Sequence, residues 1–336
     1  MYAINFISMK KNIEKLSMGY ALTKSEAAEL ITSLMNNELN EAQISSILAF
    51  YRLRPVQLQE LKGFKSALEN YSYKIELDKE TIDVCGTGGD SKNTFNISTL
   101  SAIVLAATGV PVAKHGNFGS TSISGSSDIL KYFGYNFTND RDELNRQLNQ
   151  FNICFLHAPL FHPSLKGVAQ LRKDVGYRTF FNLLGPLLNP VNICAKFVGV
   201  FNLETARLYH YYFQEENLRY SIVNSLDGYD EISLTGNFRV YTNNSERVIS
   251  PTEINFNLLK PFELIAGKSI EESAGIFLNV LQGNSTESQK NVTIANSAAA
   301  YCCYHPGSTF EHAVFHCKEA LESGKAYNLF KKIMNL

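Results

Sequence analysis

Hydrophobic residues near the start of the chain recur at helical spacing. Between residues 20 and 71, apolar positions lie three or four apart in three separate stretches, the period of an amphipathic helix. Thr23 and Glu26 form a capping box before the first stretch, Asn40 precedes the second, and Pro55 is expected to open the third. Three short helices are too few to bury all their apolar faces alone. We therefore expect this segment to pack against the rest of the chain or against a second subunit.

From Thr81 onward, short apolar runs alternate with helical stretches. The pattern predicts strands over 81–84, 110–114, 153–156, 197–201 and 220–223, and helices over 98–107, 128–133 and 204–216. This alternation is typical of an α/β layer with a largely parallel sheet. A stretch rich in glycine and proline, 176–190, interrupts it, and three further helices are expected after Ser269.

Composition and charge are those of an ordinary globular protein. With 336 residues, 45% hydrophobic and 19% charged, the chain exceeds the length of a typical single core, so two lobes are expected. Lys and Arg number 31 against 32 Asp and Glu, and a net charge of -1 gives no global attraction to nucleic acid or to anionic lipid. The longest apolar run, 103–113, is too short to span a membrane. Neither nucleic acid nor membrane is an expected partner. Because basic residues follow the apolar ones at the N-terminus, we expect a cytoplasmic protein.

The first candidate site is a glycine-rich stretch, 86–90, directly after the strand expected at 81–84. Asn96, Ser98 and Thr99 follow at the head of an apolar helix. Glycines let the backbone approach a ligand closely, and a helix N-terminus offers free N–H groups, so this stretch can hold phosphate. The spacing is not that of a Walker A loop or of a dinucleotide fold. The alternative is an ordinary glycine turn with Ser98 as a helix cap.

A second candidate site lies one strand and one helix later. Lys114 ends the strand expected at 110–114, and glycines and small hydroxyl residues are concentrated over 116–128. A cation at a strand end, followed by such a run, makes a second anion-binding concavity beside the first. Two adjacent anion sites favour a ligand that is phosphorylated at both ends. The alternative is a flexible linker, which is unusual between a buried strand and a helix.

Two adjacent carboxylates, Asp230 and Glu231, lie on the loop after the strand expected at 220–223. Mg²⁺ is usually bound through one or two carboxylates together with water and ligand phosphates. The pair is therefore a candidate magnesium site beside the two phosphate sites. Taken alone, such a pair is more often solvated surface.

Histidines and potential nucleophiles give weaker signals. His115, His157 and His162 share no H-x-x-x-H or H-E-x-x-H spacing with one another, so we expect no zinc site among them. They could line a small-molecule pocket with Asn117 and Arg172, although packing in the core or on the surface is the commoner role of a histidine. No motif pairs a serine or cysteine with a base, so covalent catalysis has no support.

In order and spacing, these motifs resemble the anthranilate phosphoribosyltransferases over nearly the whole chain. The segments that carry the resemblance are 86–90, 96–99, 114–117 with Ser122, Gly125 and Ser126, 180–190, and 228–231. The resemblance implies an α/β fold with a small all-helical N-terminal lobe and a large α/β lobe that has a mostly parallel central sheet. The helical domain would span 1–77, joined by roughly 174–192. The domain that binds phosphoribosyl pyrophosphate would span 78–173 and 193–336.

The resemblance also implies an activity and partners. The chain would be a glycosyltransferase of the pentosyltransferase type that joins the amine of anthranilate to C1 of phosphoribosyl pyrophosphate in tryptophan biosynthesis, releasing pyrophosphate. It would work as a homodimer through the helical lobe, with two Mg²⁺ ions per subunit. No residue would act as a covalent nucleophile or as a strong base.

The resemblance assigns roles to individual residues. Those expected to hold the phosphorylated donor are Gly86, Gly89, Asp90, Thr94, Asn96, Ile97, Ser98, Thr99, Lys114, His115, Gly116, Asn117, Phe118, Gly119, Ser120, Thr121, Ser122 and Ser126. Those expected at anthranilate are Gly86, Asn117, His162 and Arg172, the last through the carboxylate of the substrate. Ser98 and Glu231 would bind one Mg²⁺, and Asp230 with Glu231 would bind the second.

One position departs from the family pattern. The family usually has Arg directly after the Lys-His-Gly-Asn tetrad, whereas this chain has Phe118 there, followed by Gly119. A phenyl ring cannot neutralise phosphate, but it can pack on an aromatic substrate or hold the loop. We therefore expect Phe118 to act by packing.

Two alternatives stay open on the sequence. A pyrimidine nucleoside phosphorylase resembles this fold, but the lysine-led glycine signature of that family is absent from the first loop, and Asp230 and Glu231 argue for pyrophosphate bound through metal. A non-catalytic relative that binds nucleic acid or another partner is the second alternative. The intact motifs and the balanced charge weigh against it.

Overall fold

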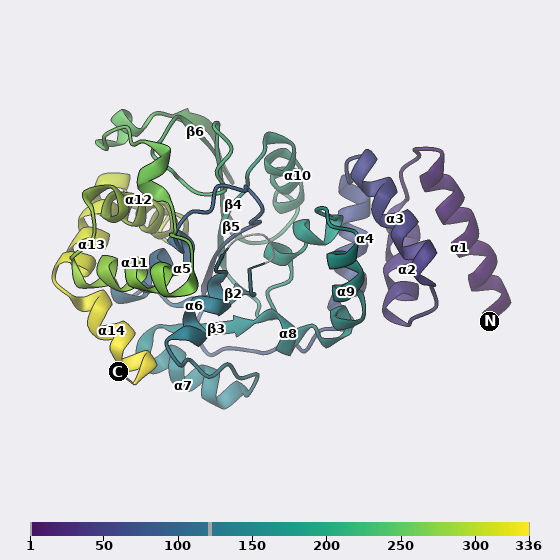
Figure 1. Cartoon of the computed structure of the whole chain (residues 1–336), viewed down its shortest axis with the longest axis horizontal. Coiled ribbons are helices and arrows are strands. Elements are labelled where there is room, and N and C mark those ends of the chain that lie inside the picture. The colour runs from purple at the N-terminus through teal and green to yellow at the C-terminus, as the bar shows by residue number, and fades with distance from the viewer. Residues whose placement is uncertain (1, 120–122, 336) are drawn as a thin grey trace. The chain divides into compact units, whose positions relative to one another are not determined.

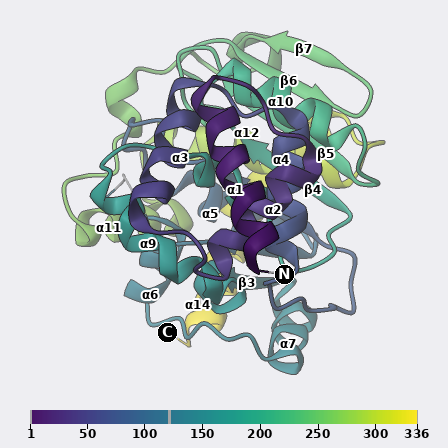
Figure 2. The same cartoon turned by 90° about the vertical axis from the view of Figure 1, so that its right-hand side faces the viewer.

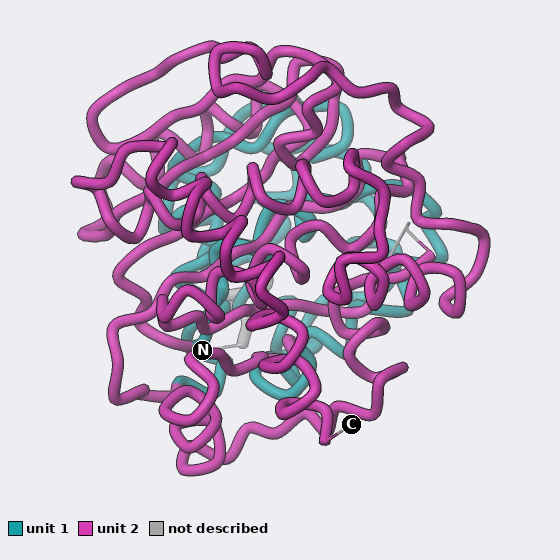
Figure 3. The backbone as a smooth tube through the Cα atoms, turned by 90° about the vertical axis from the view of Figure 1, so that its left-hand side faces the viewer, with its two compact units in different colours: residues 1–74, 159–190 teal, residues 75–158, 191–336 magenta. Residues whose placement is uncertain are grey.

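The chain folds into two compact units, each made of two separate stretches of sequence. The computed structural model describes residues 2–119 and 123–335. The helical unit comprises Met1–Lys74 and Pro159–Pro190, and the α/β unit comprises Ile75–Ala158 and Val191–Leu336 (Figure 3). The chain therefore leaves the helical unit, returns to it and leaves it again.

The helical unit begins with four helices, labelled in Figure 1: α1 (Tyr2–Ser17), α2 (Lys24–Met35), α3 (Glu41–Leu53) and α4 (Leu58–Glu69). The capping box of Thr23 and Glu26 is present at the start of α2, and Asn40 caps α3. Helix α2 packs along α4, where a Cβ added at Gly63 would overlap the backbone of α2. Three of these helices were expected from the sequence, whereas α1 was not.

The expected start of the helix after Pro55 is wrong, because α4 begins at Leu58. The carboxylate of Glu60 determines where the helix starts: it accepts hydrogen bonds from the N–H of Gln57 at 2.8 Å and from both terminal nitrogens of Arg54, at 2.9 and 2.6 Å. The backbone from Arg54 to Gln57 is therefore held in an extended path around a buried carboxylate.

The second stretch of the helical unit contains α9 (Lys166–Asp174) and 3-10 turns at Pro163–Leu165, Phe180–Leu183 and Gly185–Leu187. It begins within the short helix α8 (Ala158–Phe161) and is joined to the first stretch by a hydrogen bond from the Tyr73 N–H to the Phe161 carbonyl, at 2.9 Å. The sequence placed the return to the helical domain at about residue 174. The compact unit includes α9 as well and so begins its second stretch at Pro159.

The α/β unit is built on a seven-stranded sheet with the order β3-β2-β1-β4-β5-β6-β7. The strands are β1 (Ile82–Gly86), β2 (Val112–Gly116), β3 (Ile153–His157), β4 (Ala195–Gly199), β5 (Arg219–Ser225), β6 (Phe238–Thr242) and β7 (Glu246–Ile249). The first five are parallel, and β6 and β7 are antiparallel. The predicted fold class, a helical lobe with a mostly parallel α/β lobe, is confirmed.

Helices cover both faces of this sheet. They are α5 (Ile97–Ala107), α6 (Ser126–Tyr132), α7 (Arg141–Phe151), α10 (Leu203–Phe213), α11 (Ile270–Gln282), α12 (Glu287–Tyr304), α13 (Phe310–Glu322) and α14 (Lys325–Met334). The connection through α5 leads from β1 to its neighbour β2 on one side, and the connection through α10 leads from β4 to β5 on the other side. Because connections between parallel strands are right-handed, α5 and α10 lie on opposite faces of the sheet (Figure 1). The apolar helix α5 packs between β1 and α12 and forms the centre of the core.

Three features of this unit differ from the sequence expectations. Four helices, not three, follow Ser269, because the chain breaks at Gly283 and Gly324, both at positive φ, and at the turn after Tyr304. Strands β6 and β7, which form one edge of the sheet (Figure 2), and helix α7 were not expected. Among the described residues, no helix is long and apolar enough to cross a membrane.

Candidate active site

The carboxyl ends of β1 and β4 lie side by side at the centre of the sheet, where Gly86 and Gly199 are paired in register. From β1 the chain passes through α5 to β2 on one side, whereas β4 lies on the other side and leads outward to β5. Such a reversal of strand order leaves a crevice outside the strand ends, where α/β proteins bind ligands. Three loops meet this edge: the first loop (87–96), the second loop (described at 117–119 and 123–125) and the acidic loop (226–234).

The first loop depends on glycine conformations and contacts the acidic loop. Gly88 and Gly89 have φ angles of 64° and 78°, which favour residues without a Cβ. The N–H of Gly88 donates to Oδ2 of Asp230 at 2.7 Å. The ligand loop predicted from the glycine pattern is therefore held against the predicted metal ligands.

The two paired glycines make room for Asp230. A Cβ at Gly86 would lie 2.5 Å from Oδ2 of Asp230, and a Cβ at Gly199 would overlap the backbone carbonyl oxygen of Asp230. Both positions therefore require glycine, because any side chain there would overlap the atoms of Asp230.

Three carboxylates gather where the first loop meets the acidic loop. Burial, together with the charge of Asp90, raises the pKa of Asp230 to about 7. Burial and the charge of Asp230 raise the pKa of Glu231 well above its usual value, although Lys114 opposes that shift. Buried carboxylates that repel one another are stabilised by a cation, so this cluster has the electrostatics of a cation site.

Ser98 and Lys114 complete the cluster. Ser98 lies in the first turn of α5, and its backbone N–H lowers the pKa of Glu231. The ammonium of Lys114, which is buried in the middle of β2 and not at its end as expected, lies 2.5 Å from the Val84 carbonyl oxygen and 3.4 Å from Oγ of Ser98. The structure thus brings together Ser98, Asp230 and Glu231, all three of the residues expected to hold magnesium.

The donor atoms fit a magnesium ion that is bound partly through a ligand. In the described part of the chain, no three or more His, Cys, Asp or Glu side chains form a complete cage for a metal ion. Mg²⁺ does not need such a cage, because water and substrate phosphates complete its shell. The buried Oδ2 of Asp90 has no hydrogen-bond partner among the described residues, which leaves an oxygen beside Asp230 for a cation or its water.

Side chains of α6 and of the first loop hold the described residues of the second loop by hydrogen bonds. The carboxylate of Asp128 accepts from the N–H groups of Gly119 and Gly125, at 2.7 and 2.8 Å. The side-chain nitrogen of Asn96 donates to the carbonyls of Ser124 and Gly125, at 3.2 and 3.3 Å, so it links the first loop to the second. Because Asn96 is used in this way, it makes no side-chain cap on α5. The expected ligands Ser120, Thr121 and Ser122 lie outside the described residues.

Phe118 packs against a histidine of the α/β unit, and its expected contact with an aromatic substrate or with the helical lobe stays a prediction. Its ring, 42% exposed, meets the ring of His157 edge to face with centroids 4.7 Å apart, and the Lys131 ammonium lies 5.8 Å from its centroid. Oγ of Ser127 lies 2.9 Å from Nδ1 of His157, and Phe137 stacks on the same imidazole. Phe118 therefore closes an aromatic stack and leaves a cation, Lys131, close to the place where the family has Arg.

The residues expected at anthranilate are divided between the units. Gly86 and Asn117 belong to the α/β unit, and His162 and Arg172 belong to the helical unit. His162 is buried, with Nε2 2.8 Å from the Leu188 carbonyl oxygen. The guanidinium of Arg172 lies 5.1 Å from the ring centroid of Phe181 and makes no ion pair with a described carboxylate. Burial lowers the pKa of Arg172.

Comparisons with known proteins agree with this geometry over nearly the full length. The model of the glycosyl transferase family, a/b domain, matches residues 78–327, and that of its helical bundle domain matches residues 10–72. An anthranilate phosphoribosyltransferase of Cytophaga hutchinsonii is 45% identical over 325 residues, which cover 96% of this chain and 99% of that protein. The chain belongs to the anthranilate phosphoribosyltransferase family.

Solved structures of the family share the fold. The anthranilate phosphoribosyltransferase of Thermus thermophilus superposes with a TM-score of 0.88 at 29% identity, covering 96% of this chain and 98% of that one. The enzyme of Saccharomyces cerevisiae, solved in complex with phosphoribosyl pyrophosphate and Mg, gives a TM-score of 0.87 at 25% identity, with 98% and 97% covered.

Sequence reasoning missed several residues that hold this family's site in place. Asp83 and Lys196, opposite each other on β1 and β4, form a buried ion pair at 2.6 Å. Asn296, fully buried in α12, accepts from the N–H of Ile232 and donates to its carbonyl, both at 2.9 Å, and so fixes the acidic loop. In the sequence, the only indication of such a residue was its position inside an apolar run. That position predicts a buried polar contact but does not identify the partner.

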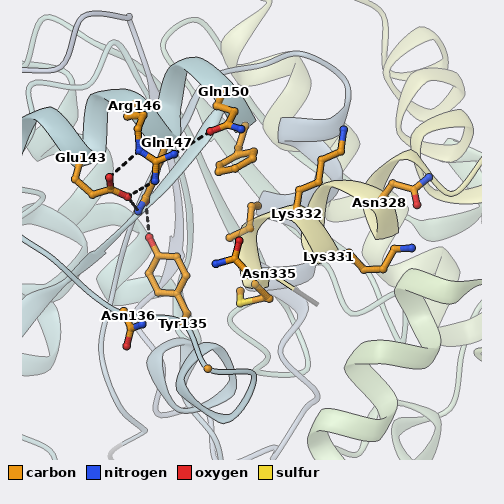
Figure 4. Close-up of a pocket in the computed structure, with 14 residues that line it drawn as sticks. Tyr135, Asn136, Glu143, Arg146, Gln147, Gln150, Asn328, Lys331, Lys332 and Asn335 are labelled. Atoms are coloured by element: carbon orange, nitrogen blue, oxygen red, sulfur yellow. Dashed lines mark hydrogen bonds and ion pairs between the residues drawn. The ribbon is translucent and has the colours of Figure 1, made fainter.

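A cavity elsewhere in the α/β unit is separate from these loops. It has a volume of about 790 Å³ and lies between α7, the turn at 134–136 and α14 (Figure 4). Tyr135, Glu143, Arg146 and Gln147 line it and are joined to one another by hydrogen bonds. None of the residues expected at the family's active site lines this cavity.

Proposed function

We propose that this chain transfers the phosphoribosyl group of phosphoribosyl pyrophosphate to the amine of anthranilate, giving N-(5-phosphoribosyl)anthranilate and pyrophosphate, in tryptophan biosynthesis. The observation that carries the proposal is the cluster of the buried carboxylates of Asp230 and Glu231 with half-buried Asp90, between a glycine loop and a helix N-terminus. The family relatives named anthranilate phosphoribosyltransferase support the choice of substrates.

The chemistry sets the task of the site. The amine of anthranilate is neutral at pH 7 and already nucleophilic, so the barrier lies in the departure of pyrophosphate and in the positive charge that develops at C1. When bound beside Asp230 and Glu231, Mg²⁺ would supply positive charge that stabilises the leaving pyrophosphate. We assign one ion to Ser98 and Glu231 and a second to Asp230 and Glu231, which gives two ions per subunit.

The residues of the chain supply position and charge. The first loop and the start of α5 are assigned to the donor phosphates through backbone N–H groups, and Lys114 supplies a buried cation beside them. Arg172 is assigned to the carboxylate of anthranilate because its guanidinium has no ion-pair partner among the described residues. Orientation of the two substrates supplies the rest, and no strong base is required.

Two further properties are proposed with this function. The helical unit is the expected surface for a homodimer, because three of its helices carry apolar stripes at helical spacing. The cytoplasm is the expected location, as for other biosynthetic enzymes that use phosphorylated metabolites.

One assay tests the activity. The protein is mixed with phosphoribosyl pyrophosphate, Mg²⁺ and anthranilate, and the loss of anthranilate fluorescence is followed. Thymidine with phosphate is the control for nucleoside phosphorolysis. Loss of fluorescence that requires both the donor and the metal supports the proposal, whereas cleavage of thymidine without loss of anthranilate overturns it.

A further inference from the structure

A pair of histidines on α13 lies outside the site described above. His312 and His316 are one helical turn apart, and their Nε2 atoms lie 3.0 Å from each other. Their ring centroids are 4.3 Å apart, with an interplanar angle of 76°. In the sequence, H-x-x-x-H spacing was considered only for His115, His157 and His162, so this pair was missed.

The surroundings of His312 determine which ring nitrogen is protonated. Nδ1 of His312 lies 3.0 Å from Oγ of Ser308, and that hydroxyl donates its own proton to the Thr309 carbonyl oxygen at 3.2 Å. Because the hydroxyl proton is already used, Oγ accepts and Nδ1 of His312 donates. The lone pair of His312 is therefore on Nε2, the atom that faces His316.

Other contacts hold the two rings in place. The ring of Tyr301 is nearly parallel to that of His316, with an interplanar angle of 13° and centroids 5.8 Å apart. His312 is exposed and His316 is half-buried, so an ion could reach both rings without losing all of its water. Metal-binding histidines typically donate their second ring N–H to an oxygen, as His312 does to Ser308.

We propose that His312 and His316 form a binding site for a late first-row divalent cation, Cu²⁺ first and Ni²⁺ next. With metal–nitrogen bonds of about 2.0 to 2.1 Å, two nitrogens 3.0 Å apart subtend an angle of about 95° at the metal. That angle suits neighbouring positions of a square-planar or tetragonal ion better than those of a tetrahedral one. Imidazole nitrogen also favours these ions over Mg²⁺, which prefers oxygen.

The protein supplies two ligands and water supplies the others. Within residues 2–119 and 123–335, no cluster of three or more His, Cys, Asp or Glu side chains has the geometry of a metal site. In the 3.0 Å contact, Nε2 of His316 donates to the lone pair of His312. On binding, that proton exchanges through solvent to Nδ1 of His316, so that both Nε2 lone pairs face the ion. No covalent or redox step is involved.

Copper titration of the full-length protein tests the site. The probe is Cu²⁺ added to the wild type and to His312→Ala/His316→Ala, followed by visible absorption and electron paramagnetic resonance. We expect the wild type to bind one equivalent more than the double variant, with a spectrum typical of nitrogen ligands. Each single variant should bind that equivalent at least about tenfold more weakly, because the second ligand then no longer binds intramolecularly.

Two further variants distinguish this pair from the other histidines. Ser308→Ala removes the acceptor of the His312 Nδ1–H and should weaken Cu²⁺ binding by about tenfold. His305→Ala removes an exposed neighbour whose ring lies 4.6 Å from Tyr301, and it should leave the extra equivalent in place. Equal stoichiometry and affinity in the wild type and the double variant would overturn the proposal.

Discussion

Two buried acidic positions, Glu60 of the helical unit and the pair Asp230 and Glu231 of the α/β unit, differ in how their charge is compensated. In the helical unit, Glu60 is fully buried and its two oxygens accept from Arg54, the Tyr51 hydroxyl, and the N–H groups of Leu22 and Gln57. In the α/β unit, Asp230 and Glu231 are also buried. Besides burial, the charge of Asp90 raises the pKa of Asp230, and the charges of Asp230 and Asp90 raise the pKa of Glu231.

The number of groups that neutralise a buried carboxylate distinguishes a structural role, as for Glu60, from a functional one, as for Asp230 and Glu231. A buried charge that is paired and fully hydrogen-bonded contributes to a defined native structure. Buried charges that repel one another cost stability and persist where a ligand neutralises them. Burial alone therefore does not identify the site, whereas incomplete compensation of charge does.

The largest effect is expected from removing the uncompensated charges. Asp230→Asn with Glu231→Gln should lower turnover at least about 100-fold, because metal-assisted stabilisation of the leaving group supplies several kcal/mol. The unfolding midpoint should stay the same or rise, since repelling carboxylates are removed from a buried place. Steady-state rates over a range of Mg²⁺ concentrations and thermal unfolding measure both effects.

A matched control lies on the same acidic loop. Asp227 is exposed and accepts a hydrogen bond from Thr235. Asp227→Asn should change turnover by no more than about twofold, as is usual for surface positions. If the double amide variant keeps wild-type turnover when Mg²⁺ is limiting, the acidic pair has no metal role.

The compensated carboxylate should show the opposite behaviour. Glu60→Gln leaves the Arg54 guanidinium without its charge partner and should lower the free energy of unfolding by about 3 to 5 kcal/mol. Activity per folded molecule should be retained. Urea denaturation gives the loss. Glu69→Gln, which removes the half-buried pair with Lys65 at 3.2 Å on the helix surface, should lower the free energy of unfolding by less than about 1 kcal/mol. Equal costs in the two variants would contradict the distinction drawn here.

Arg172 extends the comparison to an uncompensated positive charge. Arg172→Ala should raise the Michaelis constant for anthranilate and leave that for the donor nearly unchanged, with a loss of about 1.5 to 3 kcal/mol for a charged hydrogen bond. Initial rates with each substrate varied in turn give the two constants. Arg172→Lys keeps the charge but should recover only part of the lost affinity for anthranilate, because Lys cannot make the bidentate hydrogen bond of Arg to a carboxylate. An unchanged constant for anthranilate would remove Arg172 from the acceptor site.

The smallest effect is expected at Phe118, a neutral residue where the family usually has a cation. Phe118→Ala should lower the free energy of unfolding by about 0.5 to 1.5 kcal/mol, because it removes the aromatic pair with His157. It should also raise the Michaelis constant for anthranilate modestly. Phe118→Arg should be tolerated and mainly tighten the donor. If the wild type is inactive and Phe118→Arg restores transfer, the packing role is wrong.

Local patterns predicted the parts of the fold that depend on neighbouring residues. The caps at Thr23 and Asn40, the five parallel strands and the helix after the first loop follow from spacing alone. Strand β7 was missed because three of its four residues are exposed and carry no buried alternation. Helix α7 was missed because polar residues dominate it, and only Leu144, Leu148 and Phe151 mark its apolar face.

The residues of the site also fall into contiguous motifs, which the sequence could identify, and distant supports, which it could not. The glycine loop and the acidic pair are contiguous motifs, so the sequence could identify them, and the structure brings Gly88 and Asp230 into contact. The supports act through space: Asn296 contacts Ile232 across 64 positions, and Asp83 contacts Lys196 across 113. No spacing rule reaches such partners, since only the folded sheet makes them neighbours.

The paired glycines at the ends of β1 and β4 also decide where this protein can diversify. Any side chain at Gly86 or Gly199 would need the volume that Asp230 occupies, so neither position can change before the acidic loop moves. Phe118, by contrast, is exposed and can be replaced singly. A library selected for a new acceptor should therefore return glycine at both strand ends whatever acceptor is chosen, and new specificities should first arise around Phe118.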